Sequence, residues 1–208
     1  MPPDSSATKA RILVAARAEF AQFGLAGARV DRIAAAAKAN KRSIYVYFGR
    51  KEELFDTVIE RCLASAAEDV PFDPADVTSY AARLFDYFVA NPETLRLTTW
   101  NQLERGESSE SSSEVYREMV RGIAAAQRRG EADSVVDPLD LIALVMALAR
   151  AWFVASPALR GAGSDDPWSP GRLAKHRAAI VQAVASIVGS DRRPNPTAGE
   201  SVGDGARN

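Results

Sequence analysis

Residues 40–54 read NKRSIYVYFGRKEEL. Two tyrosines and a phenylalanine stand here beside four cationic side chains, although the whole chain of 208 residues has a formal net charge of −1. Over residues 29–51, seven bases face a single acid. Such a local excess is the electrostatic footprint of a protein that binds a polyanion, whereas a solvated helical face is the usual alternative for a run of charge. The spacing of the apolar residues favours the first interpretation.

Two short helices are predicted in this region. Apolar residues recur at helical spacing over residues 29–38, and Asn40 is a suitable N-cap for a second helix over 40–47. The break between them is about two residues long, which is the spacing of a helix-turn-helix motif. The second helix is therefore expected to project its outer face into a major groove of DNA.

Helical geometry predicts which side chains of the second helix face outward. Ile44, Tyr47 and Phe48 share the inner face, so Arg42 and Val46 point away from it. An arginine can bind a guanine edge through two hydrogen bonds, and a valine can contact a thymine methyl group. Polar neighbours of these two residues can bind phosphate oxygens. The expected DNA-contacting residues are Arg29, Lys41, Arg42, Ser43, Tyr45, Val46, Tyr47 and Lys51.

The rest of the chain is also predicted to be helical. Every strong periodicity is that of a helix and no alternating strand pattern occurs, so we expect an all-α protein of about nine helices. The first helix is expected to end at Gly24, and the serine- and acid-rich residues 104–114 to form a mobile loop. The expected organisation is a disordered N-terminus (1–8), a DNA-binding domain (9–54, its last helix continuing to about 66), a second helical domain (67–189) and a disordered tail (190–208).

Composition argues against several other classes of protein. The chain is 47% hydrophobic and 25% charged, which is typical of a globular protein. One cysteine (Cys62) and one histidine (His176), without a phosphate-cradling glycine loop, argue against a disulfide, a metal site, a cofactor site and an enzyme. The most apolar run, 139–155, is interrupted by Asp140 and Arg150 and is too short to span a bilayer comfortably. A cytoplasmic protein without a membrane partner is expected.

The segment Lys9–Leu54 resembles the DNA-binding domain of the tetracycline-repressor (TetR) family of bacterial transcriptional regulators. The resemblance is carried by ILVAARAEFAQFG, VDRIAAAAKANKRSIYVYF and KEEL, in this order and spacing. The chain departs from the family pattern where Lys38 replaces a glycine of the turn, Arg29 and Arg50 replace capping serine or threonine, and Arg42 replaces a common glycine. Lys38 is therefore expected to adopt a left-handed or altered turn.

The resemblance implies a homodimer that binds a palindromic operator and is released by a small, largely hydrophobic effector. Apolar residues on more than one face of the helices 138–156 and 172–188 agree with a dimer interface, although a fully internal helix is the alternative for 138–156. The interface candidates are Leu141, Leu144, Val145, Leu148, Ile180, Val184 and Ile187.

The pocket candidates are aromatic, thioether and polar residues of the second domain, for which plain core packing is the alternative. They are Phe85, Phe88, Leu97, Trp100, Leu103, Met119, Met146, Trp152 and Phe153, with the polar Arg96, Asn101 and Gln102. Two other functions stay open on the sequence alone. One is a regulator of the same family without an effector, and the other is a helical adaptor that binds only protein.

Overall fold

The computed structural model describes residues 5–106, 110–130 and 136–189, and within those ranges it contains ten helices and no strand. The prediction of an all-α protein is confirmed. The helices are α1 (Ser5–Gly27), α2 (Val30–Ala36), α3 (Lys41–Phe48), α4 (Lys51–Asp69), α5 (Val77–Ala90), α6 (Pro92–Glu104), α7 (Glu110–Arg128), α8 (Pro138–Val154), α9 (Pro157–Arg160) and α10 (Pro170–Val188). The helix beyond the expected nine is α9, a single turn.

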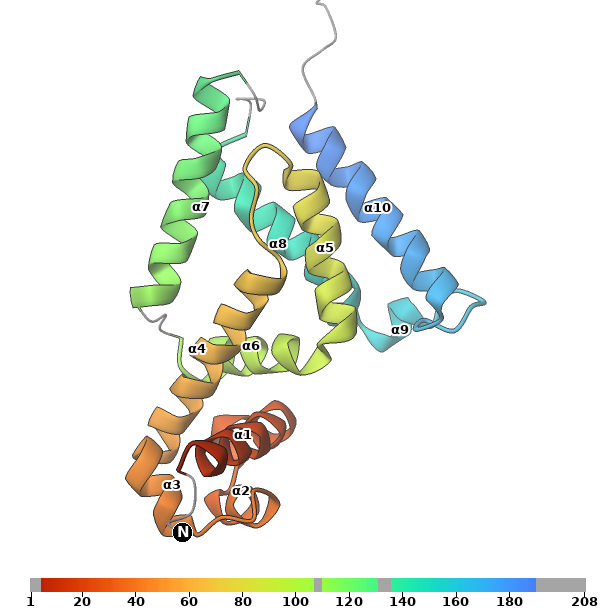
Figure 1. The fold of residues 1–208 in the computed structure, drawn as a ribbon. Coiled ribbons are helices and arrows are strands. Elements are labelled where there is room, and N and C mark those ends of the chain that lie inside the picture. The colour runs from red at the N-terminus through yellow and green to blue at the C-terminus, as the bar shows by residue number, and fades with distance from the viewer. Residues whose placement is uncertain (1–4, 107–109, 131–135, 190–208) are drawn as a thin grey trace, which may run out of the picture.

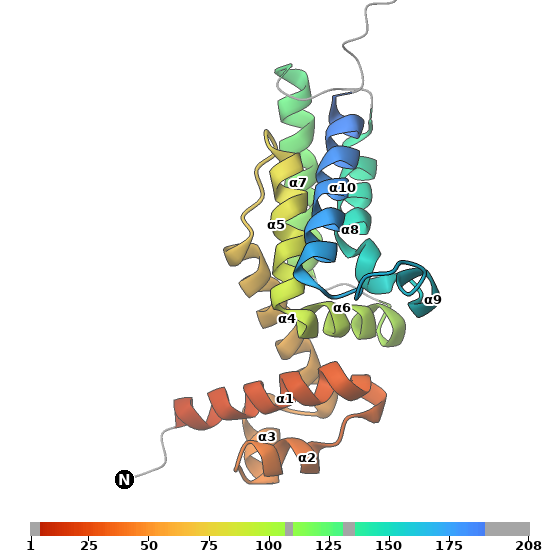
Figure 2. The same ribbon diagram turned by 90° about the vertical axis from the view of Figure 1, so that its right-hand side faces the viewer.

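Helices α1 to α3 and the first half of α4 form a separate head with its own core (Figures 1 and 2). Phe20 of α1 and Phe55 of α4 are fully buried, and their rings meet edge to face with centroids 5.0 Å apart. Ile33 of α2 and Ile44 of α3 are buried against them. Burial of four large apolar side chains at about 1.5–3 kcal/mol each fixes the angle between these short helices.

The turn between α2 and α3 has the conformation that the sequence predicts. Lys38 has a φ of 49°, in the left-handed region. The side chain of Asn40 caps α3 by accepting a hydrogen bond from the backbone N–H of Arg42 at 2.8 Å. Arg29 makes no side-chain cap on α2, and its backbone N–H instead donates to the Glu19 carboxylate at 2.8 Å.

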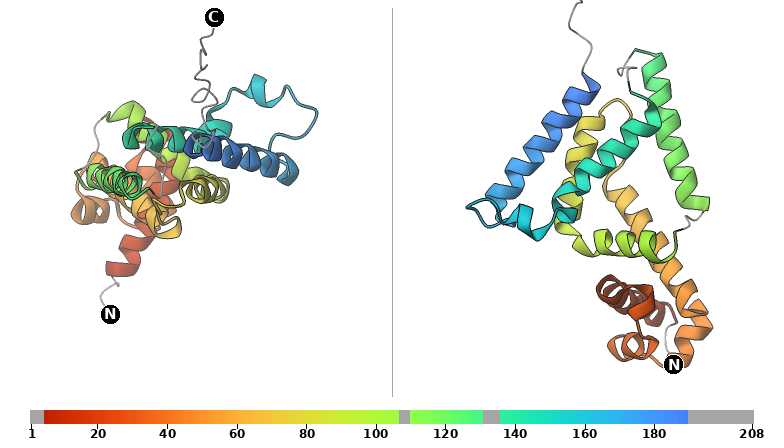
Figure 3. Two further views of the ribbon diagram at one scale, coloured as in Figure 1. Left: turned by 90° about the horizontal axis from the view of Figure 1, so that it is seen from above. Right: turned by 180° about the vertical axis from the view of Figure 1, so that it is seen from behind.

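The second domain is a layered bundle of α5, α7, α8 and α10, closed at its base by α6 (Figures 1 and 3). Helices α8 and α10 both pack against α5, and α7 packs against α8. Phe85, Ile123, Val145 and Val184 are almost completely buried in this core. Helix α4 rises from the head into this domain, while α6 lies between its base and α1 (Figure 2).

Several predicted boundaries differ from the observed ones. Residues 5–8, expected to be disordered, form the first turn of α1, where Arg11 donates a hydrogen bond to Thr8. The expected loop at 104–114 is shorter, because α7 begins at Glu110 and ion pairs of Arg117 with Glu110 and Glu114 favour its first turns. The expected disorder of residues 1–4 and 190–208 falls outside the described residues.

Proline opens two of the helices of the second domain. Pro92 opens α6 directly after α5 ends, and Pro138 opens α8 behind an Asp137 cap that accepts from the N–H of Leu139 at 2.8 Å. Among the described helices, none combines the length and the apolar character that crossing a bilayer requires.

Gly24 is expected to be difficult to replace by any other residue. Its φ of 67° and ψ of −175° are almost unique to glycine, and a Cβ atom would lie 2.8 Å from the ring of Trp100. Gly24→Ala should therefore lower the free energy of unfolding by about 1–3 kcal/mol through backbone conformation, and further through displacement of Trp100. Urea denaturation measures this. Gly163→Ala is the control, since its Cβ would meet open space; equal stabilities of the two variants would contradict the argument.

Candidate DNA-binding surface and ligand pocket

The outer face of α3 carries the side chains that the sequence placed there. Val46 is 70% exposed and Tyr45 is 46% exposed, while Ile44 on the opposite face is buried. Arg42 is also exposed, and among the described residues its guanidinium has no hydrogen-bond or ion-pair partner. An exposed arginine beside an exposed valine and a phenol can contact base edges and the DNA backbone without rearrangement of the head.

Two of the predicted phosphate-binding cations already have partners within the protein. The ammonium of Lys41 lies 2.8 Å from the Asp31 carboxylate. Their hydrogen bond lowers the pKa of Asp31 and raises the pKa of Lys41. The ammonium of Lys51 donates to the backbone carbonyls of Ala26 and Ala28 at 3.3 and 3.2 Å. Lys51 therefore holds the chain between α1 and α2, and a phosphate could use its third N–H.

The other three residues predicted to contact DNA differ in exposure. Arg29 is exposed at the start of α2, and Ser43 is half-buried on α3. Tyr47 is also half-buried, with the ring of Phe48 at its edge and the ammonium of Lys9 5.1 Å from its ring centroid. Tyr47 is thus mainly an anchor for α3. Lys9 was not among the predicted residues, and it adds a cation beside the recognition surface.

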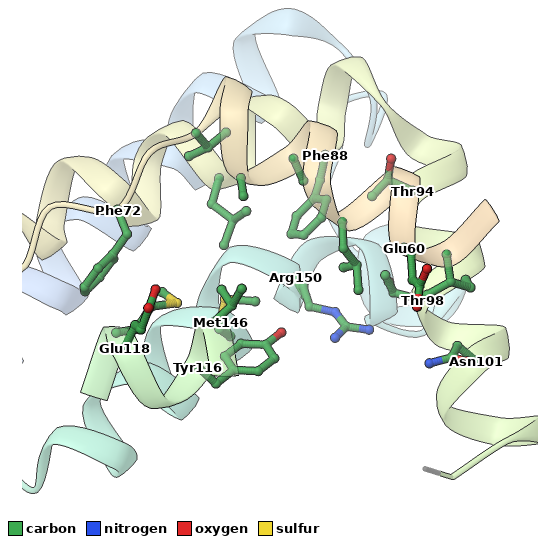
Figure 4. Close-up of a pocket in the computed structure, with 18 of the residues that line it drawn as sticks. Glu60, Phe72, Phe88, Thr94, Thr98, Asn101, Tyr116, Glu118, Met146 and Arg150 are labelled. Atoms are coloured by element: carbon green, nitrogen blue, oxygen red, sulfur yellow. The ribbon is translucent and has the colours of Figure 1, made fainter. Parts of the chain in front are cut away.

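A pocket of about 730 Å³ lies in the second domain, between α4, α5, α6, α7 and α8 (Figure 4). Its volume is in the range of sites that bind small organic molecules. The aromatic walls come from Phe72, Tyr80, Phe88 and Tyr116. Burial raises the pKa of Tyr80 to about 12, so its hydroxyl stays protonated and can donate a hydrogen bond.

The polar groups of the pocket are unevenly paired. Arg105 and Asp56 form an ion pair at 2.8 Å. Within the part of the chain that the structure describes, Arg150 has only neutral partners, the oxygens of Thr99 and Gln102, each 3.4 Å from the guanidinium. Glu60 and Glu118 also line the pocket (Figure 4), and neither has an ion-pair partner in the described ranges. The site therefore offers both donors and acceptors to a ligand within a largely apolar cavity.

The pocket brings together five of the twelve candidates named from the sequence: Phe88, Asn101, Gln102, Met119 and Met146. The structure places the other seven elsewhere. Phe85 and Phe153 pack against each other in the core, and Leu97 and Trp100 belong to the core of the head. Arg96 and Leu103 are exposed, and Trp152 lines a smaller hollow beside His176. Of the five aromatic candidates, Phe88 alone lines this pocket, so aromatic residues at helical spacing served packing more often than they lined the cavity.

The candidate interface residues fall into a buried group and a group with exposed surface. Leu141, Val145, Ile180 and Val184 are buried within the core of the single chain, so they have no exposed surface to offer a partner. Leu144 is 43% exposed, and Leu148 and Ile187 are half-buried. Exposed or half-buried small residues accompany them: Ala143, Ala147 and Ala151 on α8, and Ala174, Ala178 and Ala185 on α10. Helices α8 and α10 are neighbours (Figure 3), and small apolar side chains are among the exposed or half-buried residues of both.

The single histidine and the single cysteine both pack into apolar surroundings. His176 lies between the rings of Trp152 and Phe85, at centroid distances of 4.9 and 5.6 Å, and burial lowers its pKa. Cys62 is buried, and its thiol lies 3.1 Å from the hydroxyl of Thr94. Neither residue lies in an arrangement that suggests catalysis.

The same architecture occurs in known proteins. Residues 12–58 match the family model described as bacterial regulatory proteins of the tetR family, and residues 76–185 match the model of the tetracyclin repressor-like C-terminal domain. The HTH-type transcriptional repressor SCO4008 of Streptomyces coelicolor is 44% identical over 161 residues, which cover 76% of this chain and 83% of that protein. The HTH-type transcriptional repressor NicS of Pseudomonas putida is 37% identical over 106 residues, about half of each chain.

A solved structure extends the similarity to nearly the whole chain. The transcriptional regulator SCO4942 of Streptomyces coelicolor has a TM-score of 0.76 and 38% identity, with 90% of this chain and 99% of that chain covered. Both parts of the chain, the head and the second domain, therefore have counterparts in proteins described as transcriptional regulators.

Proposed function

The chain belongs to the TetR family of transcriptional regulators, and from that premise we propose that it is a homodimeric repressor of a palindromic operator, released by a small hydrophobic effector. Its relatives are DNA-binding repressors, so the chain is a DNA-binding regulator and not an enzyme. The observation that supports the finer proposal is the exposed outer face of α3, where Val46 and the guanidinium of Arg42, which has no partner among the described residues, project opposite the buried Ile44. Such a regulator works beside the chromosome, in the cytoplasm.

Arg42 is proposed to read a base, and its neighbours to hold the phosphates. Arg29, Lys41, Ser43, Tyr45 and Lys51 are the neighbours proposed to bind phosphate oxygens. Lys41 and Lys51 can release part of their present bonds to do so, because an exposed ion pair such as Lys41–Asp31 contributes little stability.

The operator can be obtained by selecting bound duplexes from random DNA. We expect a palindrome whose half-sites are one helical turn apart, since two-fold symmetric heads contact successive major grooves. The logarithm of the association constant should fall linearly with the logarithm of salt concentration, with a slope of about −0.9 per phosphate neutralised. A protein-only adaptor would enrich no sequence and show no such slope, and that result would contradict the proposal.

The pocket is proposed to hold the effector. Its volume of about 730 Å³, its four aromatic side chains and the apolar residues that supply most of its lining are typical of a site for a mainly hydrophobic molecule. An effector can release DNA only if it has a higher affinity for the protein conformation that does not bind DNA than for the conformation that does. α4 makes this plausible in structural terms, because its first half belongs to the head and its second half lines the pocket.

The dimer surface is proposed to be the outer face of α8 and α10. Both helices pack inward on α5, so their exposed small residues and Leu144 point away from the core. Small side chains allow close approach of partner helices, and two helices from each subunit would build a symmetric four-helix interface. Leu148 and Ile187 would lose their remaining exposed area in such a dimer.

A further inference from the structure

Helix α6 is part of both domains. Leu97 is fully buried in the core of the head, and Trp100 packs against Gly24 of α1. Asn101 and Gln102, on the neighbouring face, line the pocket. Because a helix is rigid over three turns, a ligand that displaces the pocket face of α6 also displaces the face that touches the head.

The last residues of α6 make this connection specific. Arg105 lines the pocket and is paired with Asp56 of α4, whereas its neighbour Glu104 reaches the end of α1. One oxygen of the Glu104 carboxylate accepts from the backbone N–H of Leu25 at 2.5 Å, and the other accepts from that of Ala26 at 3.1 Å. A single side chain thus binds two consecutive amides that lie 79 and 78 residues away in the sequence.

These two amides need such an acceptor. The conformation of Gly24 breaks the regular path of α1, and a carboxylate shared by successive N–H groups makes strong, charge-assisted hydrogen bonds. The ammonium of Lys51 binds the carbonyls of Ala26 and Ala28 in the same short segment. Glu104 and Lys51 together therefore fix the chain that leads into α2.

We propose that Glu104 is the positioning residue that transmits the state of the pocket to the DNA-binding head. This inference rests on the proposed ligand response and names the contact through which it acts. A ligand that shifts α6 moves the Glu104 carboxylate, and with it segment 25–28 and the start of α2. Since α2 and α3 pack as one unit, the orientation of α3 relative to the second domain changes with them. Without the carboxylate, pocket and head should respond independently.

The test compares Glu104→Gln with Glu93→Gln in the full-length protein. Glu93 is the matched control, because it lies at the other end of α6 and its carboxylate pairs with Arg17 of α1 but does not touch segment 25–28. Amide hydrogen exchange of Leu25 and Ala26 is the first measurement. Exchange should be about tenfold faster or more in Glu104→Gln and unchanged in Glu93→Gln, since a weakened acceptor frees both amides locally. Unchanged exchange in Glu104→Gln would overturn the inference.

The second measurement is the coupling between the pocket and DNA. Nile red, a neutral hydrophobic dye, serves as the probe of the pocket, and the operator selected by the wild-type protein is titrated with and without it. We expect the dye to change the dissociation constant of the wild-type protein within the usual range of about 5- to 150-fold. The ratio of the operator dissociation constants with and without the dye should fall to about twofold or less in Glu104→Gln. Nile red itself should bind this variant with unchanged affinity in the absence of DNA.

The outcomes separate this inference from the proposed function. If Nile red fails to bind, or binds the wild-type protein without changing operator affinity, the ligand response itself is refuted. If the wild-type protein responds and Glu104→Gln responds equally, only the role of Glu104 is refuted. An equal loss in Glu93→Gln would assign the coupling to the packing of α6 on α1 as a whole, which also overturns the role of Glu104.

Discussion

Arg42→Ala is expected to weaken operator binding by about 1–3 kcal/mol per half-site and to relax the sequence preference at one base of each half-site. The guanidinium of Arg42 is exposed on α3 and has no partner among the described residues, so its removal leaves the head intact. The loss should therefore be one of recognition and not of stability. Fluorescence anisotropy with the selected operator and with operators altered at single positions measures both effects.

Two further variants serve as a control and a comparison for Arg42→Ala. Arg96→Ala removes an exposed arginine of α6, far from α3, and should change neither affinity nor preference. Lys51→Ala should weaken binding to the operator and to random DNA by similar factors, because Lys51 stabilises the segment before α2 and can bind phosphate. Equal losses for Arg42→Ala on operator and random DNA would show that Arg42 binds phosphate and does not read a base.

The head could be predicted closely from the sequence because its signals are local. A cap at Asn40, an inward stripe through Ile44 and a short break at residues 38–39 fix the orientation of α3 almost without reference to the rest of the chain. The left-handed Lys38 was predictable for the same reason. Whichever residue occupies position 38 has to adopt the backbone conformation that the turn imposes.

The contacts of individual charges could not be predicted in this way. Glu19 lies on the apolar stripe of α1, and its burial is explained by Arg32, whose guanidinium lies 2.6 Å from the Glu19 carboxylate. Lys51 has the position and charge of a phosphate ligand, yet its ammonium binds carbonyls of the segment before α2. Such pairings depend on how separate helices approach one another, and helical periodicity contains no information on that.

The second domain shows a further limit of periodicity. Leu144 and Val145 are adjacent and equally apolar in the sequence, yet Leu144 is 43% exposed and Val145 is fully buried. An apolar helix can bury one face in its own core and the other in a partner, and only the packing of α8 on α5 and α7 separates the two. The pocket was predicted only in part for the same reason. Its polar residues Glu60, Glu118 and Arg150 come from three helices that the sequence does not relate to one another.

Leu144→Asp is expected to have the largest effect on function. Leu144 lies on the outer face of α8 among small residues, where a carboxylate in a closely packed symmetric interface would be buried without a partner. In a two-fold interface each change acts on both subunits, so the dimer should dissociate. Sedimentation velocity at micromolar concentration should then show monomers with unchanged helical content.

The loss of the dimer should be transmitted to DNA through effective concentration. A dimer binds its second half-site as an intramolecular event, and this advantage is commonly about 10²- to 10⁴-fold in affinity. Leu144→Asp should therefore lose operator affinity by a factor in that range while each head keeps the weak affinity of a single half-site. Leu103→Asp makes the same change at a residue of α6 that is 72% exposed and should stay dimeric and fully active.

A Leu144→Asp protein that remained dimeric would place the interface away from this face of α8. If it became monomeric but kept full affinity, the operator would be bound by single heads, and the exposed face of α3 would have to account for all of the affinity.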